Sequence, residues 1–192
     1  MPQIILASSS PYRRQLLERL GLPFQVATPN VDESAQSDET PAAMAERLAL
    51  AKAHAVARYH QNALVIGADQ VAVHAGKIVG KPRDHAQACR QLRQASGNSV
   101  TLYTGLALVN SNNGHSQSEV VPFRVLFRQL SEQQIDNYLR REQPYDCAGS
   151  VKAEGLGIAL LQRLDGDDPS ALIGLPLIRL VQMLEHEGVN VV

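Results

Sequence analysis

The chain has 192 residues, of which 44% are hydrophobic and 19% charged, so it can bury a sizeable core within one domain. A formal charge of -1 argues against a broad basic surface of the kind that binds nucleic acid. The chain has neither a signal-peptide pattern nor an apolar run near the roughly 18 residues of a membrane span. We therefore expect a cytoplasmic protein whose partner is a small molecule and not a nucleic acid or a membrane.

The first predicted elements are a strand and a helix joined by a serine-rich turn. Residues 4–7 form a short apolar run typical of a buried strand, and the serines and proline of residues 8–11 predict a turn. Three leucines between positions 16 and 20 give the inner face of a helix that begins near Pro11. Free backbone N–H groups at that helix start, together with Arg13 and Arg14, favour a phosphate. A capped helix with solvated arginines explains the same pattern.

A second strand is predicted at residues 24–27, followed by an acidic loop that contains Glu33. Thr40 and Pro41 then open a long helix by a hydroxyl cap followed by proline. At about 100° per residue, Lys52 falls at the edge of the inner face of this helix and not on its solvent side. The inner face is predicted to contain Met44, Leu48, Ala51 and Ala55.

The strand at residues 63–68 is apolar enough to be central in a sheet, and the polar pair Asp69 and Gln70 follows it directly. Residues 71–73 and 78–79 flank a glycine turn and predict a hairpin. Lys81 lies just beyond this hairpin, within Gly80-Lys81-Pro82, which is predicted to end its second strand.

The remaining chain alternates helices and strands. Asp84 caps a predicted helix, residues 100–109 and 120–127 predict long strands, and Ser131 with Gln134 has capping-box spacing ahead of another helix. Tight hairpins among helices indicate a mixed sheet.

The carboxy-terminal third begins with a small-residue loop at 147–155 that contains Glu154. Residues 158–161 predict a strand, and Leu175 with Pro176 opens a closing helix.

Cations and carboxylates occur at comparable places in the predicted structure, namely strand ends, turns and the edge of a helix. Arg13, Arg14, Lys52 and Lys81 are the cations, and Glu33 and Asp69 are the carboxylates. Both signs together suit a polyphosphate bound with a hard divalent metal, because carboxylates hold the metal while the cations neutralise phosphate. Independent surface charges are the other interpretation.

The same motifs resemble the Maf family of nucleoside triphosphate pyrophosphatases. They extend in family order from residue 4 to residue 187 and comprise residues 6–14, Glu33, Lys52, residues 67–70, residues 80–82, residues 148–155 and residues 174–176. The resemblance implies one α/β domain over residues 1–192 with an elongated mixed β-sheet, flanking helices and two lobes around a cleft, as in inosine triphosphate pyrophosphatases.

The resemblance also implies an activity and roles for particular residues. The expected reaction is hydrolysis of a nucleoside triphosphate to the monophosphate and pyrophosphate with magnesium or manganese, in a protein that forms a homodimer. Asp69 matches the family's proton acceptor and, with Glu33, a position that contacts the metal, and whether Asp69 is base or ligand stays open. The phosphate-binding positions match Ser8, Arg13, Lys52 and Lys81.

Tyr12, Gln70 and Glu154 stand where relatives that resemble dTTP and UTP pyrophosphatases have other residues. This set is similar to the subfamily that hydrolyses 7-methyl-GTP and so removes modified nucleotides from the pool. Methylation at N7 makes guanine cationic, which favours stacking on Tyr12, and Glu154 can accept from the N1–H and N2 donors together. Gln70 would add a selective hydrogen bond. A half-buried Tyr12 and a solvated Glu154 without any such role are the plainer interpretation.

Two alternatives remain at the level of the sequence. One is a dTTP or UTP pyrophosphatase of the same family. The other is a nucleotide-binding regulator without turnover, since the family is also associated with inhibition of septum formation.

Overall fold

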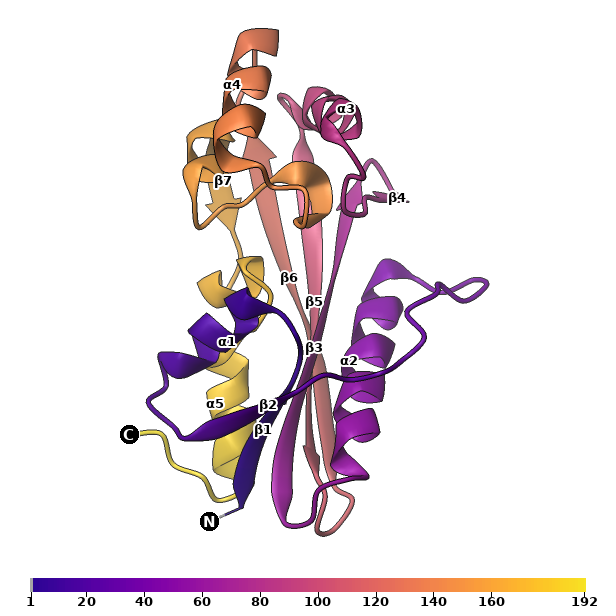
Figure 1. The fold of residues 1–192 in the computed structure, drawn as a ribbon, viewed down its shortest axis with the longest axis vertical. Helices are drawn as coiled ribbons and strands as arrows, with labels where there is room; N and C mark the ends of the chain where they lie inside the picture. The colour runs from indigo at the N-terminus through magenta and orange to yellow at the C-terminus, as the bar shows by residue number, and fades with distance from the viewer. Residues whose placement is uncertain (1) are drawn as a thin grey trace. The chain divides into compact units, whose positions relative to one another are not determined.

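A computed structural model describes residues 2–192, and the strands and helices are drawn in Figure 1. The strands are β1 (Gln3–Ala7), β2 (Phe24–Ala27), β3 (Ala63–His74), β4 (Lys77–Ile78), β5 (Ser99–Asn110), β6 (Ser116–Phe127) and β7 (Leu161–Asp165). The α-helices are α1 (Pro11–Glu18), α2 (Pro41–Ala57), α3 (His85–Ala95), α4 (Glu132–Glu142) and α5 (Leu177–His186). Short 3-10 helices are η1 (Ala148–Ser150), η2 (Leu156–Leu160) and η3 (Pro169–Leu172).

The strands form one seven-stranded mixed sheet in the order β2-β1-β3-β5-β6-β7, with β4 paired to β3. β1 is parallel to both β2 and β3, whereas β4 and β7 are antiparallel to their partners. The predicted mixed α/β sheet with flanking helices is confirmed. None of the helices within residues 2–192 has the length and apolar character that a membrane crossing needs.

The chain divides into two compact units. The first contains the described residues up to Gln70, Thr104–Val121 and Asp168–Val192, and the second contains Val71–Tyr103 and Pro122–Asp167.

In the first unit, alternating side chains of the sheet face two separate cores. Ile4 and Leu6 of β1 face one core, whereas Ile5 and Ala7 face the other, as the period-two geometry of a strand requires. Buried leucines of α1 and α5 fill the first core, and the alanines of α2 fill the second. Figure 1 shows α2 on one face of this sheet and α1 with α5 on the other. Helices on both faces explain why residues 4–7 of β1 and residues 63–68 of β3 are apolar.

Helix α2 lies unusually close to the sheet because glycines face it. A Cβ at Gly67 of β3 would lie 2.1 Å from the Ala49 carbonyl oxygen, and one at Gly105 of β5 would lie 2.1 Å from that of Ala45. This contact sets the rotation of α2, whose buried set is Ala45, Leu48, Ala49, Lys52, Ala53, Val56 and Ala57. The predicted inner face was therefore wrong by about one position. Lys52, expected at its edge, is only 6% exposed and lies within the buried set.

Replacing Gly67 with alanine should lower the free energy of unfolding by about 3 kcal/mol, because the added methyl group meets backbone atoms that cannot rotate away. Chemical denaturation measures this loss. The matched control is Gly80→Ala, since a Cβ at Gly80 meets nothing within 4 Å. Equal unfolding free energies for the two variants would contradict the close packing of α2.

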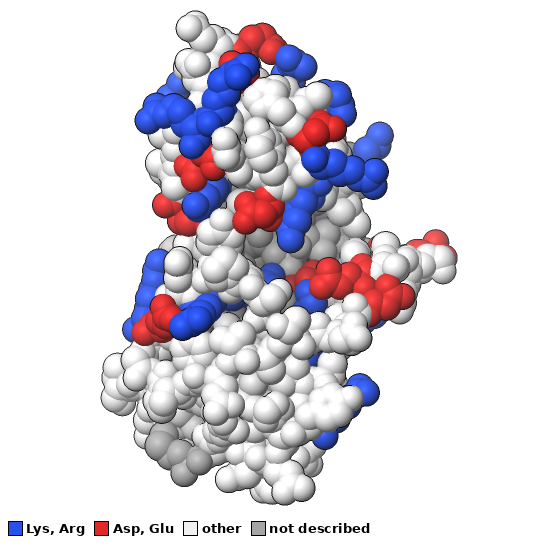
Figure 2. All heavy atoms as spheres, viewed as in Figure 1, with Lys and Arg blue, Asp and Glu red and all other residues white. Residues whose placement is uncertain are grey.

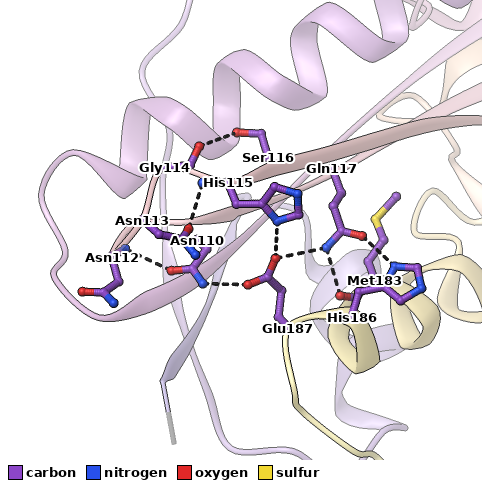
Figure 3. Close-up of polar contacts among 10 residues, drawn as sticks. All are labelled: Asn110, Asn112, Asn113, Gly114, His115, Ser116, Gln117, Met183, His186 and Glu187. Carbon is purple, nitrogen blue, oxygen red and sulfur yellow. Dashed lines mark hydrogen bonds and ion pairs between the residues drawn. The ribbon is translucent and has the colours of Figure 1, made fainter.

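A buried carboxylate ties the end of α5 to the turn between β5 and β6 (Figure 3). Glu187 accepts hydrogen bonds from Asn110 Nδ2 at 2.6 Å and Gln117 Nε2 at 3.3 Å, and it pairs with His115 Nδ1 at 2.5 Å. Burial acts to raise the pKa of Glu187, but these partners outweigh it, and the pKa lies below its ordinary value of 4.5. The ionised form is therefore the one that stabilises the fold.

We expect Glu187→Gln to lower the free energy of unfolding at about pH 7 by about 1 to 2 kcal/mol, because charge-assisted hydrogen bonds become neutral ones. A group whose pKa is depressed by folding contributes stability above its unfolded pKa and loses it as pH falls through the folded value. The difference between wild type and variant should thus shrink below about pH 4. Thermal unfolding at a series of pH values tests this, and a constant difference would contradict it.

Most predicted element boundaries agree with the structure. Ser10, Thr40, Asp84 and Ser131 cap their helices, and Ser131 with Gln134 forms the expected capping box. The expected hairpin pairs Val73 with Ile78. Its first strand is continuous with the strand predicted at residues 63–68, so Asp69 and Gln70 lie inside β3 and do not follow its end as predicted.

The strand predicted at residues 158–161 was wrong, because η2 occupies 156–160 and β7 begins at Leu161. The N–H groups of Gly155 and Gly157 both donate to the Lys152 carbonyl, which closes a turn in place of an extended strand.

Candidate functional site

The turn after β1 places Ser8 and Arg13 together at the start of α1. Ser10 caps the helix and accepts a hydrogen bond from the Arg13 backbone N–H at 3.4 Å, with Pro11 at the first helical position. The buried Ser8 hydroxyl accepts from the Ser10 N–H at 3.1 Å and lies 3.5 Å from Arg13 Nη1. Arg14 instead forms an exposed ion pair with Glu18. The turn therefore contributes one guanidinium to the cluster and not the two that the sequence suggested.

Three expected site residues meet at Lys52. Its ammonium Nζ lies 2.6 Å from Asp69 Oδ1 and 2.7 Å from Glu33 Oε1. Lys52 and Asp69 are buried, whereas the Glu33 side chain is 61% exposed. The cluster thus extends from the buried middle of β3 to the solvent.

The acidic loop before α2 is fastened to that helix by Arg47. Arg47 Nε and Nη2 bind the Glu39 carboxylate at 2.5 and 2.8 Å, and Nη2 also donates to the Ser34 carbonyl at 3.1 Å. This fork positions the loop that contributes Glu33.

Arg13 is oriented from the other end of the chain. Its Nε donates to the Gly174 carbonyl at 2.8 Å, and a Cβ at Gly174, whose φ is +116°, would lie 3.5 Å from that Nε. Burial lowers the pKa of the Arg13 guanidinium, while the carboxylates of Asp69 and Glu33 act against this shift. Arg13 therefore shares one electrostatic environment with the Lys52 cluster.

Gln70 uses its amide nitrogen within the protein. Nε2 donates to Thr104 Oγ1 at 2.9 Å and to the carbonyls of Ala171 at 2.8 Å and Leu172 at 3.3 Å. Thr104, which is fully buried, also donates to the Ala171 carbonyl at 2.9 Å. Only the side-chain oxygen of Gln70 is left to contact a substrate.

Asp168 is a supporting residue for which no role was predicted. It is 2% exposed and accepts from the Ser170 N–H and hydroxyl at 3.0 and 2.6 Å and from the Ile178 N–H at 2.8 Å. It therefore caps η3 and the start of α5, on either side of Gly174. The spacing Asp168-Pro169-Ser170 is typical of a cap and could have indicated this.

The second unit contains Lys81 and Glu154. The Gly80 carbonyl accepts from Gln91 Nε2 at 3.0 Å and from the Gly149 N–H at 3.3 Å, so two motifs far apart in sequence are joined within this unit. Lys81 and Glu154 are both exposed. The structure thus brings Ser8, Arg13, Glu33, Lys52, Asp69 and Gln70 together in the first unit, with Tyr12 half-buried on α1.

The comparison with known proteins identifies the family. Residues 3–187 match the model of the Maf family, described as Maf-like protein. The chain belongs to the Maf family. This Maf chain is also 59% identical over 187 residues to a 7-methyl-GTP pyrophosphatase of Nitrosococcus oceani, an alignment that covers 97% of the chain and 94% of that relative.

Two carboxylates in this Maf chain could hold a hard cation. Glu33 and Asp69 already converge on one cationic atom, Lys52 Nζ, and carboxylate oxygens are the ligands that Mg²⁺ prefers. Within residues 2–192 no group of three or more His, Cys, Asp or Glu side chains is placed to hold a metal. A cation at this site would therefore take its remaining ligands from phosphate and water.

On the face of the Maf chain drawn in Figure 2, basic and acidic side chains are mixed, apart from one small group of adjacent acidic side chains, and no broad basic surface is seen. This agrees with the formal charge of -1. Attraction for a phosphate group must then come from a local cluster such as the one around Arg13 and Lys52.

Proposed function

We propose that the protein hydrolyses 7-methyl-GTP to 7-methyl-GMP and pyrophosphate in the cytoplasm and so removes a modified nucleotide from the pool. The observation that carries this proposal is the cluster in which Lys52 Nζ lies within 2.7 Å of both Asp69 and Glu33. Its occurrence in a Maf chain 59% identical to a 7-methyl-GTP pyrophosphatase supports the substrate.

The charges of the cluster suit a metal-bound triphosphate better than a free one. Arg13 and Lys52 contribute two positive charges, and Glu33 and Asp69 contribute two negative charges. A neutral cluster gives little net attraction for a highly charged bare triphosphate, but it can accept one whose charge is partly neutralised by a divalent cation. Ser8, Arg13 and Lys52 then bind the phosphates, with Lys81 of the second unit as a further phosphate ligand.

Glu33 and Asp69 are the residues that would hold this cation, which is Mg²⁺ or Mn²⁺ in our proposal. When bound, it supplies Lewis-acid stabilisation of the negative charge on the phosphates.

The hydrolytic step breaks the bond between the α-phosphorus and the oxygen that bridges to the β-phosphate. The oxygen of a water molecule attacks the α-phosphorus, and pyrophosphate leaves with the electron pair of the broken bond. Asp69 orients that water by accepting its hydrogen bond and takes up the proton that the water loses, and Arg13 and Lys52 stabilise the charge that develops on the departing pyrophosphate.

We assign recognition of the base to Tyr12, Glu154 and Gln70. Tyr12 lies on the first turn of α1, next to Arg13, where its ring can stack on a cationic purine. Glu154 is an exposed carboxylate that can accept both donors of the guanine edge. Gln70 contributes its side-chain oxygen, because its amide nitrogen already donates to Thr104 and Ala171.

A substrate panel tests the proposed function. Release of pyrophosphate is measured from 7-methyl-GTP, GTP, dTTP and UTP, with and without Mg²⁺. We expect metal-dependent turnover with kcat/KM highest for 7-methyl-GTP, and pyrophosphate, not phosphate, as the product. Equal or faster turnover of dTTP or UTP would contradict the assigned specificity, and binding of every nucleotide without turnover would favour a regulator.

Replacing Glu154 with glutamine should reduce the preference for 7-methyl-GTP over UTP by about tenfold or more, because an amide oxygen accepts more weakly than a carboxylate and its nitrogen opposes the N1–H donor. The ratio of kcat/KM values measures this preference. Glu185→Gln, at an exposed position of α5, is the matched control. An unchanged ratio would remove Glu154 from base recognition.

A further inference from the structure

The second unit contains a pocket of about 240 Å³ that involves none of the proposed site residues. The end of β6, one face of α4 and the segment of η2 form its walls. The lining residues are Arg128, Gln134, Asn137, Tyr138, Arg141, Leu156, Ala159 and Leu160. Neither Lys81 nor Glu154 is among them.

The lining of the pocket contains two basic side chains and no acidic one. Arg128 and Arg141 are both exposed, and no lining residue is Asp or Glu. Within residues 2–192, neither guanidinium has an ion pair or a side-chain hydrogen bond. Their neighbour Arg140 differs, since its Nε lies 2.7 Å from Asp136 Oδ2.

The acids of α4 are already engaged, and Glu132 pairs with Arg93 Nη2 at 2.7 Å. Glu142 pairs with Lys152 Nζ at 3.4 Å and accepts from the Leu156 N–H at 2.6 Å. Asp136 is held by Arg140 and by His85 Nε2 at 3.1 Å. No acid of α4 is therefore left to neutralise the two arginines.

The floor of the pocket is apolar and uncharged. Leu160 is buried and Leu156 is half-buried. Tyr138 is a buried residue of α4, and its hydroxyl oxygen accepts from the Lys152 N–H at 2.9 Å. Burial raises the pKa of Tyr138 well above its ordinary value, so the phenol stays neutral. Asn137 adds an amide that can donate and accept.

We infer that this pocket binds a small organic anion, with its phosphate or carboxylate held by Arg128 and Arg141 and its compact apolar part on the floor of Leu156, Leu160 and Tyr138. Two guanidiniums without acidic partners repel each other, and an anion both relieves this repulsion and forms charge-assisted forks with them. The volume lies below the range of about 300 to 1,000 Å³ typical of drug-sized ligands, which limits the apolar part to about one ring. This inference does not depend on the proposed hydrolysis.

Phenyl phosphate, benzoate, inorganic phosphate and phenol are the probes for the test. Backbone amide shifts of Asn137, Leu156 and Ala159 are followed by NMR during titration of the full chain. We expect saturable shifts with phenyl phosphate or benzoate at a Kd of about 1 mM, a value in keeping with so small a ligand. Inorganic phosphate and phenol, which each lack one half of the recognised group, should bind at least about tenfold more weakly. A preference between phenyl phosphate and benzoate identifies the anionic group.

Variants separate this pocket from the proposed active site. Arg128→Gln and Arg141→Gln should each weaken binding by about tenfold, while the control Arg140→Gln leaves the Kd within about twofold. Shifts at Ser8 and Lys52, if phenyl phosphate also binds there, should persist in the pocket variants. Absence of shifts at the three pocket amides, equal binding of phenol, or an equal effect of Arg140→Gln would overturn the inference, whether or not the protein hydrolyses nucleotides.

Discussion

Asp69→Asn should reduce kcat for 7-methyl-GTP hydrolysis by about a thousandfold, while a nucleotide still binds. The substitution keeps the shape of the side chain but removes the charge that pairs with Lys52 at 2.6 Å and that would orient water and hold a cation. Single-turnover measurements of pyrophosphate release give the rate of the chemical step. Calorimetry with a non-hydrolysable analogue of 7-methyl-GTP gives the affinity.

The matched control for this experiment is Asp38→Asn, which removes an exposed carboxylate of the acidic loop before α2. We expect its kcat to remain within about twofold of wild type. A rate for Asp69→Asn within about tenfold of wild type would mean that neither a base nor a metal ligand is needed at this position.

Lys52→Met should reduce kcat/KM for 7-methyl-GTP by about a hundredfold and lower the free energy of unfolding by about 2 kcal/mol. Methionine retains an apolar stem on the buried face of α2 but lacks the ammonium group that lies between Asp69 and Glu33. The buried Asp69 carboxylate then loses its nearest cation, and a buried charge without a partner is costly.

The double variant Lys52→Met/Asp69→Asn distinguishes the two effects. Removing the carboxylate as well should restore most of the lost stability, because no unpaired charge remains, but it should not restore activity. Lys77→Met, at an exposed position of β4, is the control for loss of a lysine charge. If the double variant is less stable than Lys52→Met, the ion pair with Asp69 does not explain the effect of the single change.

The sequence predicted much of the site because the family motifs contain the residues that form it. Arg13, Glu33, Lys52 and Asp69 were named from their places at a turn, a loop, a helix edge and a strand end, and Ser8 was named from the family resemblance. The structure brings all five together within the first unit. Their separate roles in binding and hydrolysis remain proposals, as does the part of Lys81 and Glu154.

The supporting contacts could not be predicted, because they join residues that are distant in the chain. Arg13 is positioned by Gly174, 161 residues away, and Gln70 donates to Ala171, 101 residues away. No local pattern indicates such pairs, since they depend on the order of the strands and on where α5 begins. The same holds for Asp168, whose partners appear only when η3 and α5 are placed.

By itself, the sequence determined the local structure of this Maf protein. Caps at Ser10, Thr40 and Ser131 depend on a side chain and a backbone N–H three residues apart, so the printed order of residues is enough to specify them. The continuous apolar run of β1 likewise specified a strand with two covered faces.

Only the tertiary structure decided which face of α2 is buried and what Lys52 contacts. Because Gly67 and Gly105 have no side chain, Ala49 and Ala45 of α2 approach the sheet closely. This contact sets the rotation of the helix, so that Lys52 is buried and its ammonium group reaches Asp69. Helical periodicity fixes the angles between side chains but not the rotation of the helix about its own axis. That rotation follows from the shape of the surface on which the helix packs.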